Sequence, residues 1–303
     1  RLERLTALCA RVREIDSAYP KSQLGGPQSA NAHEKPIELL ATTISALPSD
    51  QRRLAADHVM DAYFGTGALT EVHTPTDVNE LLVQLASAGL DPSASDTWYD
   101  PACGTAGVGS AVAGLPDGGR FFGQELSEEA ASVATMRAVL GGGTADVRVG
   151  DTLRLDAFAG VSFDFAVSAP PLGTVRESID FGWLPEACPA VRKVRESSLL
   201  FAGAALAKLR RAEDGGGTAA ILTLPSAMHS RADSAIRRWL VEAGYLQAVI
   251  QLPNGLLNST SAASMAILLS TRPDRPGRTR VVDASGVFSD EREQGTERRR
   301  TLR

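Results

Sequence analysis

The 303-residue chain has little cysteine, and its thiols at Cys9, Cys103 and Cys188 show neither a C-x-x-C pair nor a metal-binding spacing. Few and unpatterned thiols favour a reducing compartment over a disulfide-bonded extracellular protein. No apolar run reaches the ~18–20 residues of a membrane span, and no charged-then-apolar secretory signal is present. We therefore expect a cytoplasmic protein without a membrane partner.

An excess of basic residues is also missing. The formal net charge of −5 argues against a protein that holds nucleic acid over its whole surface, although a local basic face remains compatible with it. The hydrophobic content of 43% and charged content of 22% are ordinary for a globular protein, and the length suits one large domain with a helical appendage. The first residue is not methionine, which fits a piece of a longer protein.

The pattern of apolar residues divides the chain into three parts. In residues 1–72 they recur at the three- and four-residue steps of a helix face, as at Leu2, Leu5, Leu8, Val12 and Ile15. This part predicts a small helical domain whose apolar stripe serves packing rather than chemistry. Residues 73–290 alternate between strand and helix patterns, and residues 291–303 predict a charged tail.

The alternating part predicts an α/β fold in which crossover helices join parallel strands. Candidate strands are residues 97–100, 120–124, 146–149, 163–168, 218–224, 246–252 and 264–269, with one further candidate at 279–283. Helices are expected at 128–140, with Ser127 as N-cap, and at 199–209 and 231–243. The sixth and seventh strands are joined by a loop too short for a helix, so the seventh strand should be antiparallel. We expect a Rossmann-like, mostly parallel seven-stranded sheet with its last strand reversed.

Two motifs indicate a cofactor of the adenosine type. The segment DPACGTAG (100–107) follows the first strand, and its small residues let the backbone approach a ligand closely. Glu125 ends the second strand, where a carboxylate accepts hydrogen bonds from a ribose diol. The glycine spacing is G-x-x-G-x-G, whereas dinucleotide sites have G-x-G-x-x-G.

Three other segments stand at the ends of predicted elements. Thr74, Pro75 and Asp77 open the helix before the first strand, with Thr74 as its cap, Pro75 at its first position and Asp77 bonded back to the cap. Asp151 follows the third strand, where a carboxylate accepts a hydrogen from an adenine amino group. The fourth strand leads into APPLG (169–173), and such a double proline makes the chain rigid at the open end of a sheet.

In this order the motifs resemble those of the modification (methylation) subunit of type I restriction-modification systems, the adenine-specific DNA methylase family. The family pattern is an aromatic residue before Thr-Pro, then Asp-Pro-x-x-Gly-Thr-Gly-Gly, Tyr-Gly-x-Glu, Gly-Asp-x-Leu and Asn-Pro-Pro-Phe-Gly, and the resemblance extends over residues 70–290. His73 replaces the aromatic residue, and Ala106 replaces a glycine of the second motif; both changes are compatible with cofactor binding. It implies a class I methyltransferase domain over residues 73–290 with S-adenosylmethionine as cofactor. It also implies DNA as substrate, a specificity subunit as partner and a restriction subunit as a further candidate partner.

The resemblance also implies roles for individual residues. Cofactor contacts fall on Thr74, Asp100, Pro101, Ala102, Gly104, Thr105, Gly107, Glu125, Leu126, Asp151 and Thr152. The catalytic segment is Ala169, Pro170, Pro171 and Leu172.

The catalytic segment departs from the family pattern at two positions. In the family, the Asn oxygen and a backbone carbonyl accept the two hydrogens of the adenine amino group, while the aromatic residue stacks on the flipped base. Ala169 has no acceptor and Leu172 has no ring. Losing one preorganised transition-state contact lowers a rate by ~10²–10³. Ser168 lies one residue too early and should point elsewhere.

Arg192, Lys193 and Arg195 lie in the long segment after the double proline, where they could contact DNA phosphate or simply face solvent. Three functions remain open at this point. The first is a DNA adenine methyltransferase subunit, and the second is a homologue that binds S-adenosylmethionine or DNA with impaired transfer. The third is a small-molecule methyltransferase, which the double proline disfavours.

Overall fold

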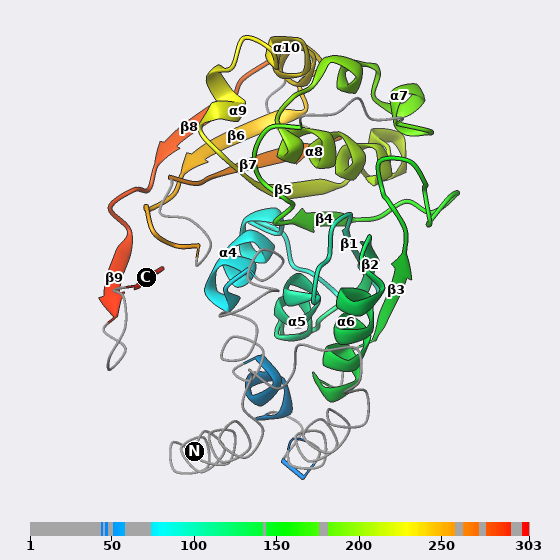
Figure 1. Cartoon of the computed structure of the whole chain (residues 1–303), viewed down its shortest axis with the longest axis vertical. Coiled ribbons are helices and arrows are strands. Elements are labelled where there is room, and N and C mark those ends of the chain that lie inside the picture. The colour runs from blue at the N-terminus through cyan, green and yellow to red at the C-terminus, as the bar shows by residue number, and fades with distance from the viewer. Residues whose placement is uncertain are drawn as a thin grey trace, which may run out of the picture.

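The computed structural model describes residues 44, 46–47, 51–57, 74–141, 144–175, 181–257, 263–272, 277–291 and 299–302. Its central feature is an eight-stranded sheet of order β3-β2-β1-β4-β5-β7-β6-β8. Helices cover both faces of this sheet (Figure 1). The strands are β1 (Thr97–Asp100), β2 (Arg120–Glu125), β3 (Ala145–Val149), β4 (Phe165–Ser168), β5 (Thr218–Thr223), β6 (Leu246–Gln251), β7 (Met265–Ser270) and β8 (Arg280–Asp283).

The direction of the strands confirms the predicted class I arrangement. Strands β1 to β5 pair in parallel, whereas β7 runs antiparallel to both β5 and β6. The further candidate strand is β8, which pairs in parallel with β6 at the edge of the sheet.

The helices form one layer on each face of the sheet. One layer holds α4 (Thr76–Ala86), α5 (Gly107–Ala113) and α6 (Glu128–Gly141), and the other holds α8 (Ser197–Lys208) and α10 (Ser234–Glu242) (Figure 1). Shorter elements are α7 (Leu184–Ala187), η3 (Pro189–Lys193), η4 (Ala212–Asp214) and α9 (Ser226–His229). Among the described residues, none of the helices has the length and apolarity needed to cross a membrane.

Side chains that alternate along β1 fill the two cores. Trp98 packs with the α4 and α5 layer and stacks on Phe165, with ring centroids 4.1 Å apart. Tyr99 packs on the opposite face with α8 and stacks on Phe163 at 4.7 Å. This alternation follows from the two-residue repeat of a strand. These two side chains pack the sheet against a helix layer on each face. The residues at the carboxyl ends of the strands are then free to form the site.

Two helix starts were predicted, and the structure confirms one of them. The Ala130 amide donates to Ser127 Oγ at 3.2 Å, so Ser127 caps α6 as expected. The prediction for α4 was wrong, because the helix begins one residue later and Pro75 occupies the N-cap position without a side-chain cap. Thr74 therefore lies outside the cap, and the Asp77 carboxylate accepts from the neighbouring Val78 amide at 3.1 Å.

The two ends of the chain are described only in part. Residues 51–57 are helical, whereas most of the helical domain predicted over residues 1–72, including the stripe from Leu2 to Ile15, lies outside the described residues. Strand β10 (Arg299–Leu302) lies within the segment predicted as a charged tail, and it pairs in an antiparallel manner with β9 (Phe288–Glu291) at the end of the predicted 73–290 domain. The domain boundaries 1–72, 73–290 and 291–303 stay predictions.

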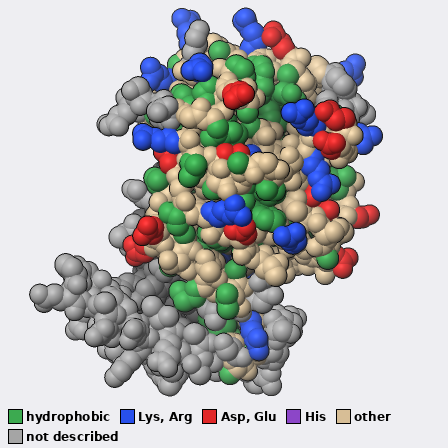
Figure 2. All heavy atoms as spheres, turned by 90° about the vertical axis from the view of Figure 1, so that its right-hand side faces the viewer, with side chains coloured by type: hydrophobic (Ala, Val, Ile, Leu, Met, Phe, Trp, Pro, Cys, Tyr) green, Lys and Arg blue, Asp and Glu red, His purple; other side chains and the backbone are tan. Residues whose placement is uncertain are grey.

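The charge on the surface is mixed. On the face seen in Figure 2, Lys and Arg side chains are interspersed with Asp and Glu over the part that the structure describes. This distribution agrees with the net charge of −5 and with the expectation that any nucleic-acid contact is local.

Candidate functional site

The predicted motifs meet along one edge of the sheet. Because β1 to β4 are parallel, their carboxyl ends lie at the same edge, and the order β3-β2-β1-β4 sets the sequence of the loops there. The residues that follow these strands therefore lie in a row along this edge, in the order Asp151, Glu125, Asp100 and Ala169. In open α/β sheets, ligands bind at this edge where the strand order reverses, which here is between β1 and β4.

The turn after β1 has the backbone that its small residues predict. Gly104 and Ala106 both adopt left-handed conformations, with φ of 52° and 57°. Alanine tolerates that conformation at a cost of roughly 1–2 kcal/mol, so Ala106 can replace the family glycine here. Thr105, between them, is 2% exposed.

Glu125 anchors this turn from the end of β2. Its Oε2 accepts from the Gly104 amide at 2.8 Å, and its Oε1 accepts from the Ser127 amide at 2.9 Å. A carboxylate offers about four acceptor positions, so capacity for a diol remains. The next residue, Leu126, is 70% exposed and can cover a planar base.

The loop after β3 is tied to the same turn. Thr152 is buried, and its hydroxyl donates to the Pro101 carbonyl at 2.5 Å. Asp151 accepts from the Leu153 amide at 3.0 Å and lies 3.3 Å from the Arg154 guanidinium. The loop is thereby fixed with its acid at the edge of the sheet.

Asp100 is a buried acid whose partner is Ser168. The Ser168 hydroxyl donates to Asp100 Oδ1 at 2.7 Å, and the Ala102 amide donates to the same oxygen at 3.0 Å. Burial raises the pKa of Asp100 to about 7, although these two hydrogen bonds act in the opposite direction. Ser168 is therefore engaged with Asp100 at the end of β1.

The segment after β4 is held rigidly at its far side. Ala169 and Leu172 are partly buried against the α4-side core, while Pro170 is buried and Pro171 exposed. The Gly173 amide donates to Glu196 Oε1 at 3.0 Å. Sequence reasoning missed Glu196, which is 3% exposed; an acid just before a helix gives no signal of a partner more than twenty residues away.

A small cavity joins three of the motifs. Its volume is about 20 Å³, and it is lined by Thr74, Asn79, Asp100, Ala102, Cys103, Thr105, Gly107, Val108 and Ala169. A space of this size holds one water-sized group. It can therefore take only one end of a cofactor, and the remainder would have to lie over the surrounding loops.

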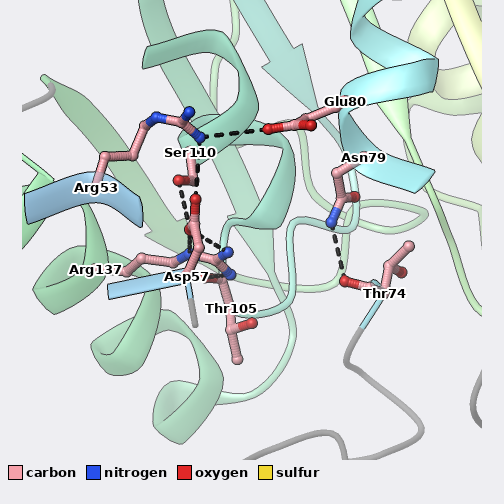
Figure 3. Close-up of polar contacts among 8 residues, drawn as sticks. All are labelled: Arg53, Asp57, Thr74, Asn79, Glu80, Thr105, Ser110 and Arg137. Carbon is pink, nitrogen blue, oxygen red and sulfur yellow. Dashed lines mark hydrogen bonds and ion pairs between the residues drawn. The ribbon is translucent and has the colours of Figure 1, made fainter. Parts of the chain in front are cut away.

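Asn79 is a second residue that sequence reasoning missed. It is 2% exposed on α4, and its Nδ2 donates to the Thr74 carbonyl at 3.0 Å (Figure 3). A Cβ added at Gly107 would overlap this amide, so the glycine is required by the close approach of α4 to the turn. The available signal was a polar residue on the otherwise apolar buried face of α4, beside Val78 and Leu82.

Of the predicted basic residues, Arg195 lies close to the segment that follows the double proline. Arg192 and Arg195 are exposed, and the side chain of Lys193 lies outside the described residues. The Val175 amide donates to the Arg195 carbonyl at 2.7 Å, and residues 174 and 196 form an antiparallel bridge. The structure thus brings Arg195 next to the segment that follows β4.

Comparison with known proteins agrees with this geometry. The family model described as N-6 DNA Methylase matches residues 59–302. A curated relative, the type I restriction enzyme MpnII methylase subunit of Mycoplasma pneumoniae, is 25% identical over 247 residues, which cover 73% of this chain and 44% of the relative. The chain thus spans less than half of that relative's length.

Two solved structures have a similar fold. The type I restriction-modification methyltransferase subunit from Streptococcus thermophilus matches 99% of this chain and 68% of its own, with a TM-score of 0.74 at 21% identity. A putative class I S-adenosylmethionine-dependent methyltransferase from Listeria monocytogenes matches 92% and 85%, with a TM-score of 0.64 at 17% identity.

Proposed function

Because the chain belongs to the N-6 DNA methylase family, whose cofactor is S-adenosylmethionine, we propose that it is the adenine-N6 methylation subunit of a type I restriction-modification system in which methyl transfer is slowed. The observation that carries this proposal is the cavity shared by Thr74, Asp100 and Ala169 at the carboxyl edge of the sheet. Three motifs far apart in the sequence meet there.

The residues at this edge fit the cofactor. The backbone of residues 104–107 would face its methionine part, the Glu125 carboxylate its ribose diol, and the Asp151 carboxylate its adenine amino group, with Leu126 against the base. When bound, S-adenosylmethionine supplies an electrophilic methyl group. The protein's part is to hold this group against the target nitrogen and to keep water away from it.

The segment at residues 169–172 supports a slow transfer step. A backbone carbonyl at Ala169 or Pro170 can accept one hydrogen of an adenine amino group, but the Ala169 side chain offers no second acceptor. Leu172 offers no ring, and a lost base–aromatic stack costs ~1–3 kcal/mol. The missing acceptor removes a further ~10²–10³ in rate. Ser168, bonded to Asp100, is not directed to this task.

Binding of DNA would involve the exposed residues Arg192 and Arg195, with Lys193 between them. The backbone of Arg195 pairs with the segment that follows the double proline, and phosphate contacts there would set the register of the duplex. The resemblance to type I modification subunits implies that a partner specificity subunit makes the sequence choice. A restriction subunit is a further candidate partner, and the cytoplasm is the expected compartment.

Single-turnover methyl transfer to DNA, with the partner subunit present, tests the proposal. The double substitution Ala169→Asn, Leu172→Phe should raise the rate by ~10²-fold or more, because it restores the acceptor and the ring. The matched control Ala169→Leu, Leu172→Met adds similar bulk without either group and should leave the rate low. A wild-type rate that the first variant does not improve would contradict the proposed defect.

A second function is favoured by the same substitutions. Ala169 and Leu172 suit a homologue that binds S-adenosylmethionine or DNA and transfers no methyl group. Calorimetry and single-turnover transfer together separate the two functions. Cofactor binding by the wild type, with no methyl transfer even in the Ala169→Asn, Leu172→Phe variant, would favour the binding role.

A further inference from the structure

A buried ion pair lies directly behind the turn of residues 104–107. Arg137 of α6 is 2% exposed, and its Nε and Nη2 donate to Asp57 Oδ1 at 3.1 and 2.6 Å (Figure 3). Its third nitrogen, Nη1, donates to the Thr105 carbonyl at 3.4 Å. One guanidinium therefore connects the helical segment 51–57 with the backbone of the turn.

The Asp57 carboxylate is fully engaged by three elements. The hydroxyl of Ser110, on the helix that continues directly from the turn, donates to Oδ1 at 2.6 Å. Arg53, on the same segment as Asp57, donates to Oδ2 at 3.0 Å and lies 3.6 Å from Glu80 of α4. Asp57 itself is only 3% exposed.

Burial makes this arrangement depend on the docking of residues 51–57. A buried charge is tolerated only when it is paired and hydrogen-bonded. If the segment undocked, Arg137 and Ser110 would both lose the carboxylate. The guanidinium would then move toward water, and its bond to Thr105 would be released with it.

We infer that Asp57 is a positioning residue of the cofactor site, acting through Arg137 on Thr105 and through Ser110 on the start of α5. Docking of residues 51–57 and binding of cofactor then strengthen each other, since coupling between two sites is reciprocal. This inference rests on the proposed function, because it takes the turn as the place where the cofactor binds.

The test uses two variants that disturb the pair differently, in the full 303-residue chain. Arg137→Lys keeps the charge opposite Asp57 but loses the planar fork that also reaches Thr105. Asp57→Asn keeps the shape and removes the charge. The control Arg210→Met removes the ion pair between Arg210 and Asp164, 2.7 Å apart before β4 at the opposite end of the sheet.

The first measurement is hydrogen exchange without cofactor. The amides of residues 103–107 should exchange roughly tenfold faster in Arg137→Lys and Asp57→Asn than in the wild type and in Arg210→Met. If Arg137→Lys and Asp57→Asn do not fold, Ser110→Ala removes a single bond to Asp57 and should show a smaller change of the same sign.

The second measurement is calorimetric affinity for S-adenosylmethionine. It should weaken about tenfold in both variants, because the cofactor must then order a turn that the ion pair no longer holds in place. The cofactor should also protect the amides of residues 51–57 from exchange in the wild type but not in Arg137→Lys, which a merely structural role would not produce.

The two ideas fail in different ways. Unchanged exchange at residues 103–107, or unchanged affinity, in both variants overturns the positioning role of Asp57. A wild-type chain that does not bind S-adenosylmethionine overturns the proposed function instead, and the exchange comparison still decides whether Asp57 holds the turn.

Discussion

Single acidic residues of the site differ in what the fold does to them. Asp100 is 2% exposed and shares its Oδ1 between the Ser168 hydroxyl and the Ala102 amide. Glu125 is partly exposed and divides its two oxygens between two backbone amides. The protonation of Asp100 is therefore expected to change the stability of the chain with pH. The role of Glu125 is better tested by a substitution that removes its two backbone contacts.

The buried Asp100 predicts a fall in stability with rising pH. Its pKa is about 7 in the folded chain against an ordinary value of 3.8, chiefly because of burial. Between these two values only the unfolded chain ionises, so this group lowers the free energy of unfolding by up to ~1.4 kcal/mol per pH unit, and the loss is complete above about pH 7.

Denaturant unfolding of the wild type and Asp100→Asn from pH 4 to pH 8 measures this contribution. Both hydrogen bonds to Asp100 reach Oδ1, which asparagine retains. The free energy of unfolding of the wild type minus that of the variant should fall with pH up to about 7. A flat or rising difference would contradict the buried neutral state.

Glu125 predicts a loss of cofactor affinity. Glu125→Ala removes a charged acceptor and should weaken S-adenosylmethionine binding in calorimetry by about 1–3 kcal/mol. Glu125→Gln keeps one of the two backbone contacts, so its affinity for the cofactor should lie between those of the wild type and Glu125→Ala. The exposed neighbour Glu129→Ala is the control and should bind as the wild type does. Equal affinity of wild type and Glu125→Ala would remove the ribose role.

At the scale of elements, α4 and α5 pack against each other so closely that position 107 has no room for a side chain. Asn79 on α4 lies against Gly107 at the first position of α5 and also holds the Thr74 carbonyl. This contact sets the position of the segment before α4 relative to the turn. It is the part of the site that a single methyl group would disturb.

Gly107→Ala should therefore destabilise the chain by about 1–3 kcal/mol, the usual cost of overpacking. Asn79→Ala in the same chain makes room, so the double variant should be less destabilised than the sum of the two single variants. Thermal or denaturant unfolding of the four proteins measures this. Gly286→Ala, where the added Cβ meets nothing within 4 Å, is the control. If the losses in the free energy of unfolding of the two single variants simply add in the double variant, residues 79 and 107 are not coupled by this contact.

At the scale of the whole molecule, charge limits how DNA can be held. The net charge is −5, and acidic and basic side chains are mixed on the face in Figure 2. Under the proposed function, attraction to phosphate would then come from a few local groups. Arg192 and Arg195 are exposed, and the backbone of Arg195 pairs with the segment after β4, which makes these two arginines the groups to test.

The dependence of DNA affinity on salt provides the test. Each phosphate contact contributes a slope of about −0.9 to log K against log salt, so Arg192→Ser, Arg195→Ser should reduce the slope by roughly two. The matched variant Arg272→Ser, Arg278→Ser removes two other exposed arginines and should leave the slope unchanged. Equal slopes for all three proteins would place the phosphate contacts elsewhere.

The elements of the sheet were predictable because their signals are local. A strand shows an apolar run and a helix shows a 3.6-residue repeat within a short window, so β1 and α6 lie where they were expected. The ends were less certain. Phe163 was expected within the fourth strand, but it makes an isolated bridge with Leu209, and β4 begins at Phe165. A local sequence pattern does not indicate at which residue the pairing with a neighbouring strand ends.

The sequence by itself determined the order of the motifs, and parallel strand order then brought Asp100, Glu125 and Asp151 to one edge. Only the tertiary structure decided which partners hold them. Arg137 meets Asp57 across 80 positions of sequence, and Glu196 meets Gly173 across 23. Contacts of this kind depend on how helices pack on the sheet, and no periodicity within either segment records that packing. For the same reason, the raised pKa of Asp100 follows from its burial rather than from its neighbours in the chain.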